Sequence, residues 1–219
     1  MTKRRAIVDL LILLLVFWLT WGTQYLDFTQ YGPATVLVSA VVIIILLKMR
    51  KIAWADIGLV RVKNGGVLIK HTLMVMLLTF VIQAIGITIA NLFSTDLTGS
   101  SAITTQPDNL FLFLFDIVFT TWLITGLGEE FIFRGFILHH LKTIFPSSRY
   151  FIVASLIQAA WFGLGHASQG ITGMIITGAI GFFLAQYYLK NKEVGLLPLI
   201  LSHGVIDTVV LTANYINKL

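Results

Sequence analysis

The chain of 219 residues contains no cysteine, and only 11% of its residues are charged. The absence of cysteine excludes cysteine catalysis, disulfide frameworks, zinc knuckles and iron–sulfur ligation. Soluble domains are about 25% charged and about 45–50% apolar. This chain is 57% apolar, with a mean hydropathy of +0.90. One small core cannot hide that much apolar surface, so the composition predicts an integral membrane protein.

Seven apolar stretches are each long enough, or nearly so, to cross a hydrocarbon layer of roughly 30 Å. They cover residues 6–21, 33–47, 67–93, 109–144, 150–164, 171–189 and 194–213. The sequence therefore predicts an all-α polytopic transmembrane helix bundle of about seven helices, within a range of six to eight. We expect residues 1–219 to form a single integral membrane domain, because no repeat or low-complexity tract divides the chain.

Basic residues gather on one side of this predicted bundle. With the N-terminus in the cytoplasm, every Lys and Arg except Arg134 and Lys218 falls in a cytoplasmic segment, and the opposite segments carry none. Such an asymmetry is the positive-inside pattern of cell-membrane proteins. It predicts a multi-pass protein of the cell membrane with a cytoplasmic N-terminus. It also explains the net charge of +5 without a nucleic-acid partner.

An ionisable side chain inside an apolar span is costly, so each one is a functional candidate. The chain has three glutamates, and Glu129 and Glu130 are adjacent within one apolar stretch. Glu130 and Arg134 are four residues apart, so a helix places them on one face, where they can pair. Glu129 is turned about 100° away and has no counter-ion on its own helix. We expect the pair to be structural and Glu129 to carry chemistry, although all three could simply hold helices together.

Two histidines lie in two later apolar stretches. His166 ends the run Trp161–His166, and His203 precedes Asp207 by four residues, so a helix places these two on one face. Taken alone, His166 is better explained by a packing role or an interhelical hydrogen bond, and His203 with Asp207 is equally well explained by a buried pair that joins helices. The polar residues thus form three clusters: residues 129–134, His166, and His203 with Asp207. Each cluster needs hydrogen-bond partners that its own helix cannot supply, so the simplest arrangement brings the three clusters together.

Three other polar positions are expected to carry no chemistry. Asp9 lies inside the first apolar stretch and is interpreted as an interhelical hydrogen-bond partner. His139 and His140 lie near the cytoplasmic end of the fourth stretch, where we expect a solvated helix end.

Histidines and carboxylates within a bundle suit two hydrolytic mechanisms. In one, a glutamate and a histidine activate water while other groups stabilise the oxyanion. In the other, a divalent metal such as Zn²⁺ is held by side chains and keeps an open position for water. The candidate metal ligands are Glu129, His166, His203 and Asp207. The sequence does not decide between a metal-assisted mechanism and one without a metal. It contains no HExxH, GxSxG, SxxK or P-loop motif that would indicate another chemistry.

The three motifs, in this order, resemble the CPBP family of intramembrane proteases. That family contains type II CAAX prenyl endopeptidases and bacterial proteins linked to bacteriocin processing or self-immunity. Its pattern is EExxxR, FxxxH and HxxxN or HxxxD on separate helices, matched here by residues 129–134, 162–166 and 203–207. The motif-bearing half covers about residues 109–215. Asp207 stands where Asn is more common, so it is either protonated, a group that orients His203, or a metal ligand.

The resemblance implies an endopeptidase that cleaves a membrane-associated or lipidated peptide or protein. If the residue roles of that family hold here, Glu129 and His166 activate the water, and His203 and Asp207 stabilise the oxyanion. The Glu130–Arg134 pair then supports the helix that carries the first motif. The implied partners are the lipid bilayer and a peptide or membrane-protein substrate. Two other classes remain: a non-catalytic membrane binding or scaffold protein, such as one for bacteriocin self-immunity, and a transporter with a proton relay.

One geometric requirement follows from this assignment. With straight helices of even rise, Glu129 and His166 would differ in depth by roughly 10–15 Å. Helix tilt or a shifted helix boundary must therefore bring them together.

Overall fold

The computed structural model describes residues 1–22, 32–92, 107–147 and 151–218, and within these ranges it contains helices and no strand. Within these ranges, seven long helical segments follow one another. They are α1 (Lys3–Gly22), α2 (Gly32–Arg50), α3 (Gly65–Leu92), a long helix (Leu110–Ile144), α6 (Phe151–Leu164), α7 (Gly170–Lys190) and α8 (Leu197–Lys218). The predicted all-α bundle of about seven helices is confirmed. The expected limits at Phe93 and Tyr150 lie outside the described residues.

Five of these helices are long and apolar enough to cross a membrane. They are Pro33–Arg50, Gly65–Leu92, Leu110–Ile144, Ala167–Lys190 and Leu197–Asn217. The polytopic membrane character predicted from composition is therefore confirmed. α6 is a shorter apolar helix of 14 residues.

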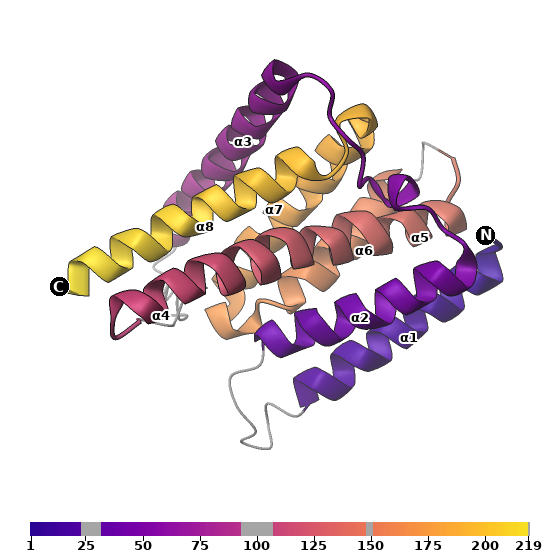
Figure 1. Cartoon of the computed structure of the whole chain (residues 1–219), viewed down its shortest axis with the longest axis horizontal. Coiled ribbons are helices and arrows are strands. Elements are labelled where there is room, and N and C mark those ends of the chain that lie inside the picture. Colours follow the sequence, from indigo (N-terminus) through magenta and orange to yellow (C-terminus); the bar gives the residue numbers. More distant parts are fainter. Residues whose placement is uncertain (23–31, 93–106, 148–150, 219) are drawn as a thin grey trace.

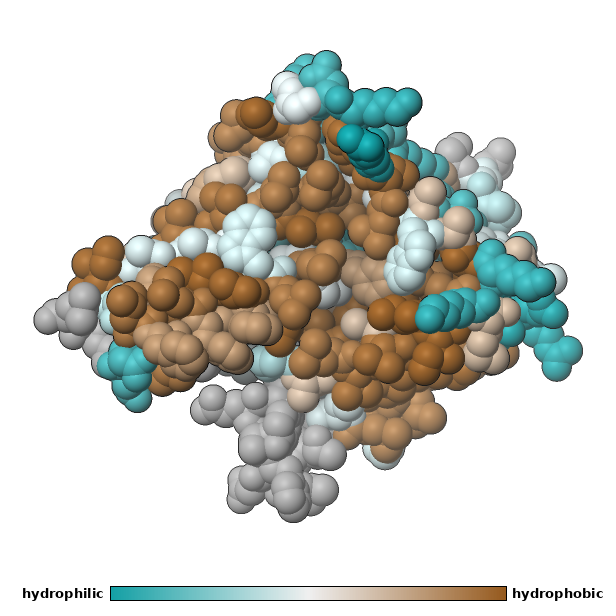
Figure 2. Space-filling view, viewed as in Figure 1, coloured by the Kyte–Doolittle hydropathy of each residue, from teal (hydrophilic) through white to brown (hydrophobic). Residues whose placement is uncertain are grey.

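The surface of the molecule is apolar along its flanks. Figure 2 shows hydrophobic residues over most of this face, with hydrophilic residues gathered towards the ends of the helices. Large apolar side chains point outward from several helices, for example Leu15 of α1, Ile45 of α2 and Leu77 of α3, each more than half exposed. Such a surface suits lipid rather than water. Figure 1 places the N- and C-termini at opposite ends.

The long helix Leu110–Ile144 is the hub of the bundle. Its parts pack against α1, α2, α6 and α8, and Figure 1 shows it running between α2 and α8. Asn109 begins it by accepting a hydrogen bond on its side chain from the backbone N–H of Leu112 at 3.0 Å. Every side chain of Phe131–Ile137 is buried. The helix therefore carries its polar residues into the middle of the protein.

This hub is wound differently from an ordinary α-helix. It begins as α4 (Leu110–Phe115), continues as the π-helical segments η3 (Asp116–Glu129) and η4 (Phe131–Ile137), and ends as α5 (Leu138–Ile144). A π-turn closes its hydrogen bonds from residue i to i+5, so it holds more residues than an α-turn. π-Turns are enriched at functional sites in general.

A polar cluster joins the first two helices to α5. Asp9 is fully buried, and its carboxylate accepts bonds from Arg50, of which the shortest is 2.6 Å. His140 Nε2 lies 3.3 Å from the other oxygen of Asp9, and the His140 side chain is also fully buried. The expected interhelical role of Asp9 is confirmed. The expected solvation of His140 is wrong, because α1 covers this end of the long helix.

The link between α2 and α3 folds back onto the same end of the bundle. It contains the short 3-10 helix η2 (Trp54–Ile57) and then Gly58, whose φ is +87°. A side chain at Gly58 would be strained, and its Cβ would meet the ring of Tyr188. The Gly58 carbonyl accepts a bond from the backbone N–H of Leu196 at 2.8 Å. This contact fixes the entry into α8.

Candidate active site

Two glycines let the long helix and α8 approach closely. A Cβ added at Gly126 would lie 3.4 Å from the backbone nitrogen of Gly204. A Cβ added at Gly204 would lie 2.7 Å from the ring of Trp122. Small residues at such crossings let two membrane helices pack backbone to backbone. The polar residues of α8 are thereby brought against those of η3.

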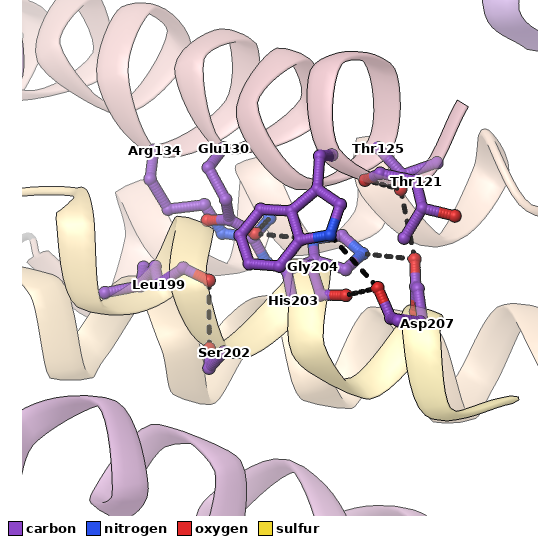
Figure 3. Close-up of polar contacts among 11 residues, drawn as sticks. Thr121, Thr125, Glu130, Arg134, Leu199, Ser202, His203, Gly204 and Asp207 are labelled. Carbon is purple, nitrogen blue, oxygen red and sulfur yellow. Dashed lines mark hydrogen bonds and ion pairs between the residues drawn. The ribbon is translucent and has the colours of Figure 1, made fainter. Parts of the chain in front are cut away.

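Glu130 forms the centre of the polar cluster shown in Figure 3. Its Oε1 accepts a bond from Arg134 Nη1 at 3.1 Å, and both side chains are fully buried. The pairing predicted from their spacing is confirmed. The same oxygen lies 3.1 Å from His203 Nδ1 on α8, a contact that no spacing within one helix reveals. The Arg134 guanidinium also stacks 4.4 Å from the ring centroid of Phe162 on α6.

Asp207 lies one helical turn beyond His203 on α8. His203 Nε2 is 3.5 Å from Asp207 Oδ2, at the outer limit for a hydrogen bond. The same Asp207 oxygen lies 3.1 Å from the hydroxyl of Thr125, and that hydroxyl also lies 2.7 Å from the Thr121 carbonyl. His203 is therefore held between two carboxylates, each of which has a further partner on the long helix.

Glu129 lacks the partners that its neighbour has. Its Oε2 is buried and accepts no hydrogen bond from any described residue. The charges of His166, His203 and Asp207 all act on its carboxyl group, so the three predicted clusters converge around it. A buried carboxylate oxygen without a partner is costly to fold. Glu130 Oε2 is also buried without a partner, but Glu130 is paired through its Oε1. The Glu129 side chain forms no hydrogen bond or ion pair with a described residue, so its carboxyl group is the one left open to another molecule.

His166 reaches the cluster from beyond the end of α6. α6 ends at Leu164, and His166 follows in a turn before the 3-10 helix Ala167–Gln169. His166 Nδ1 is 2.8 Å from the Phe162 carbonyl, and only an N–H can bond to a carbonyl. In neutral His166 this leaves Nε2 as an acceptor. His166 is near enough for its charge to act on the Glu129 carboxyl group, as the predicted assignment requires.

The described residues do not assemble a metal site. Among them, no group of three or more His, Asp and Glu side chains has the spacing to hold a metal ion. Both ring nitrogens of His203 already face carboxylates, and Nδ1 of His166 faces a carbonyl. The set Glu129, His166, His203 and Asp207, one of the two predicted arrangements, does not fit a metal here.

Three contributors to the cluster were not predicted. Thr125 contacts Asp207, Trp122 Nε1 donates to the Thr208 hydroxyl at 3.1 Å, and Phe162 supports Arg134. Thr125 precedes Glu129 by four residues, so it shares its helix face. That spacing is the signal that would have found it. Trp122 gave no such signal. Phe162 is the first residue of the match at residues 162–166, but that pattern does not predict its contact with Arg134.

The fold and the cluster together define a multi-pass helical membrane protein with a buried site of carboxylates and histidines. Residues 109–209 match the family described as Rce1-like, type II CAAX prenyl endopeptidase Rce1-like. The matched segment contains all six predicted site residues, and the match confirms the resemblance to CPBP membrane proteases.

The match supports a CAAX-type membrane protease in general terms. It supports neither a metalloprotease subtype nor a role in bacteriocin immunity. Comparison with curated proteins and with solved structures gave no match.

Proposed function

We propose that this protein is an intramembrane endopeptidase in which Glu129 activates the water that attacks a peptide carbonyl. The observation that carries the proposal is the buried Glu129 Oε2 without a hydrogen-bond partner, set among the charges of His166, His203 and Asp207. A carboxylate in that setting accepts a proton from water as the water oxygen bonds to the carbonyl carbon. When the tetrahedral intermediate collapses, the C–N bond breaks and Glu129 returns the proton to the leaving amine.

His166 is the second group that acts on the water. Because its Nδ1–H is used by the Phe162 carbonyl, its Nε2 lone pair is left to accept a hydrogen bond from the attacking water. With Glu129 as the base, two acceptors then fix both protons of one water molecule. Fixing the water in this way contributes through orientation rather than through charge.

His203 is the donor that stabilises the oxyanion. Its Nδ1 is held by Glu130, whose charge is in turn shared with Arg134. Because Nδ1–H is donated to Glu130, His203 also carries an N–H on Nε2 only as the imidazolium. That N–H is 3.5 Å from Asp207, too far for a strong bond, so it is available to an oxygen that becomes negative. Asp207 contributes by orienting the His203 ring, because an ionised carboxylate cannot donate to an oxyanion.

The substrate class follows from where the site lies. The cluster is enclosed by helices whose outer faces are apolar, so its substrate is a peptide bond in a membrane-associated or lipidated chain. We assign all 219 residues to one integral membrane domain, with residues 109–215 forming the half that bears the catalytic motifs. The N-terminus is assigned to the cytoplasm.

Removal of the Glu129 carboxylate tests the proposal. Purified protein in nanodiscs is incubated with a peptide library that includes prenylated members, and cleavage is followed by mass spectrometry. We expect Glu129→Gln and His166→Ala to lose about 10²–10⁴-fold in kcat/KM, the usual contribution of general acid–base groups. Glu193→Gln is the matched control, because Glu193 is exposed and lies outside the cluster.

Folding is monitored by size-exclusion chromatography and by the melting temperature of each variant. Cleavage that survives Glu129→Gln in a folded protein contradicts the assignment of the base. If wild type cuts no peptide, and cells carrying Glu129→Gln show the same phenotype as cells carrying wild type, the protein is instead a binding or scaffold protein.

A further inference from the structure

A hollow lined by three arginines opens at the end of the molecule where α1 begins and α2 ends. Its volume is about 460 Å³, and its lining residues are Thr2, Arg4, Arg5, Val8 and Arg50. Figure 1 places the N-terminus at this end, and Figure 2 shows hydrophilic surface gathered there. Two separate helices therefore bring guanidinium groups to one hollow.

The protein does not neutralise the positive charge of this hollow. Asp9 binds Arg50 through both of its carboxylate oxygens, so that guanidinium is held in place. Arg4 and Arg5 are exposed and form no ion pair with a carboxylate of the described residues. One buried carboxylate thus stands against three guanidinium groups. The net positive charge of the hollow favours the binding of an anion.

The chemistry of the lining indicates which anion. The planar fork of arginine matches two oxygens of a phosphate, and three such forks can surround a phosphate group. Val8 gives the hollow an apolar edge. Outward apolar side chains continue from it along α1, including Leu11 and Leu15, which are 57% and 54% exposed. A ligand that combines a phosphate with an acyl chain satisfies both parts of this surface.

We propose that the hollow binds the phosphate of an anionic phospholipid from the leaflet at the N-terminal end of the bundle. Basic pockets between membrane helices are a general means of holding such headgroups. The bound headgroup contacts Arg50, which Asp9 connects to His140 on α5. The lipid therefore fastens α1 and α2 to the helix that carries Glu130, and it raises the melting temperature of the protein. This proposal does not depend on the protein being a protease.

Lipid titration with matched charge variants tests the proposal. Binding of phosphatidylglycerol and of phosphatidylcholine to detergent-purified protein is measured by native mass spectrometry. We expect Arg4→Gln/Arg5→Gln to weaken phosphatidylglycerol binding roughly 30-fold, since each basic residue near an anionic lipid contributes about 1 kcal/mol. The control Arg61→Gln/Lys63→Gln removes two exposed charges from the link that packs at the same end, and it is expected to bind like wild type.

Melting temperatures in nanodiscs give the second readout. Phosphatidylglycerol in the disc should raise the melting temperature of wild type and of the control, but not of Arg4→Gln/Arg5→Gln. Melting in pure phosphatidylcholine checks that all variants are folded. If the double variant does not fold, the single exposed substitution Arg4→Gln is used, with an expected loss of roughly fivefold.

Two results would overturn the proposal. Equal losses of phosphatidylglycerol binding in both double variants would mean diffuse attraction to the whole basic end. An equal stabilisation by inorganic phosphate in phosphatidylcholine nanodiscs would assign the hollow to the free anion rather than to a lipid.

Discussion

At the scale of single residues, the hydroxyl of Thr125 has two acceptors and one proton. The Thr121 carbonyl lies 2.7 Å from it and the Asp207 carboxylate lies 3.1 Å from it. A hydroxyl donates one bond at a time but accepts two. When this proton points to the carboxylate rather than to the Thr121 carbonyl, Thr125 restrains Asp207, and through Asp207 it restrains the ring of His203. It is a positioning residue rather than a catalytic one.

Loss of this hydroxyl is expected to reduce turnover while leaving the protein folded. Thr125→Val keeps the shape of the side chain and removes its bond to Asp207. A hydrogen bond to a charged group contributes about 1.5–3 kcal/mol, so we expect kcat/KM to fall roughly tenfold or more. The measurement is peptide cleavage in nanodiscs, with kcat and KM determined separately. The loss should appear in kcat, because a positioning group acts in the transition state.

Two variants separate this effect from a general loss of stability. Thr125→Ser keeps the hydroxyl and should retain most of the activity. Thr88→Val removes a comparable intrahelical bond, from the Thr88 hydroxyl to the Ala84 carbonyl at 2.8 Å, at an exposed site on α3. It should leave kcat unchanged. Full activity in Thr125→Val would show that Asp207 is held by other means.

At this scale, spacing within one helix was predictable and contact between helices was not. The Glu130–Arg134 pair follows from a separation of four residues, because helix geometry fixes which side chains meet. The bond that His203 Nδ1 donates to Glu130 joins residues 73 positions apart, and no local rule predicts it. His140 shows the same limit. Its burial depends on Asp9 of α1, 131 positions away.

At the scale of elements, α6 and α7 meet at two glycines. A Cβ at Gly163 would lie 2.6 Å from the backbone oxygen of Met174, which cannot move without moving α7. A Cβ at Gly178 would lie 3.4 Å from the Ala159 oxygen, an ordinary contact. The two positions face each other across the same crossing. Only one of them requires glycine for space.

We therefore expect Gly163→Ala to push α6 away from α7. Overpacking of this kind costs about 1–3 kcal/mol, so the melting temperature should fall. The activity of the protein that remains folded should also fall, because α6 leads to His166 and carries Phe162, which stacks on Arg134. Gly178→Ala is the matched control, with a smaller change in both quantities. Equal melting temperatures for the two variants would contradict this account of the crossing.

The elements themselves were predictable from hydropathy, but their winding was not. Each of the seven apolar stretches corresponds to one helix, because an apolar run of that length has few alternatives in a bilayer. The last helix starts at Leu197 rather than at residue 194, with Pro198 in its first turn, where the missing N–H costs nothing. The π-winding of residues 116–137 has no comparable sequence signal.

At the scale of the whole molecule, the two ends differ in charge. Most described basic residues lie at the end of the molecule that holds the N-terminus. They come from α1, from the link after α2 and from the end of α7. The C-terminus lies at the opposite end. Positive charge is retained on the cytoplasmic side during membrane insertion. The distribution supports the proposed cytoplasmic N-terminus.

The absence of cysteine makes this orientation simple to test. Lys63→Cys places a single thiol in the exposed link before α3, and Asn217→Cys places one in the exposed last turn of α8. No native thiol competes with either label. With the N-terminus inside, a membrane-impermeant maleimide should label Asn217→Cys in intact cells and should label Lys63→Cys only after permeabilisation. Each variant is the control for the other, because both thiols must react fully in detergent. The reverse pattern would place the N-terminus outside. It would also move the arginine-lined hollow to the outer leaflet, since α1 and the link before α3 meet at the same end of the bundle.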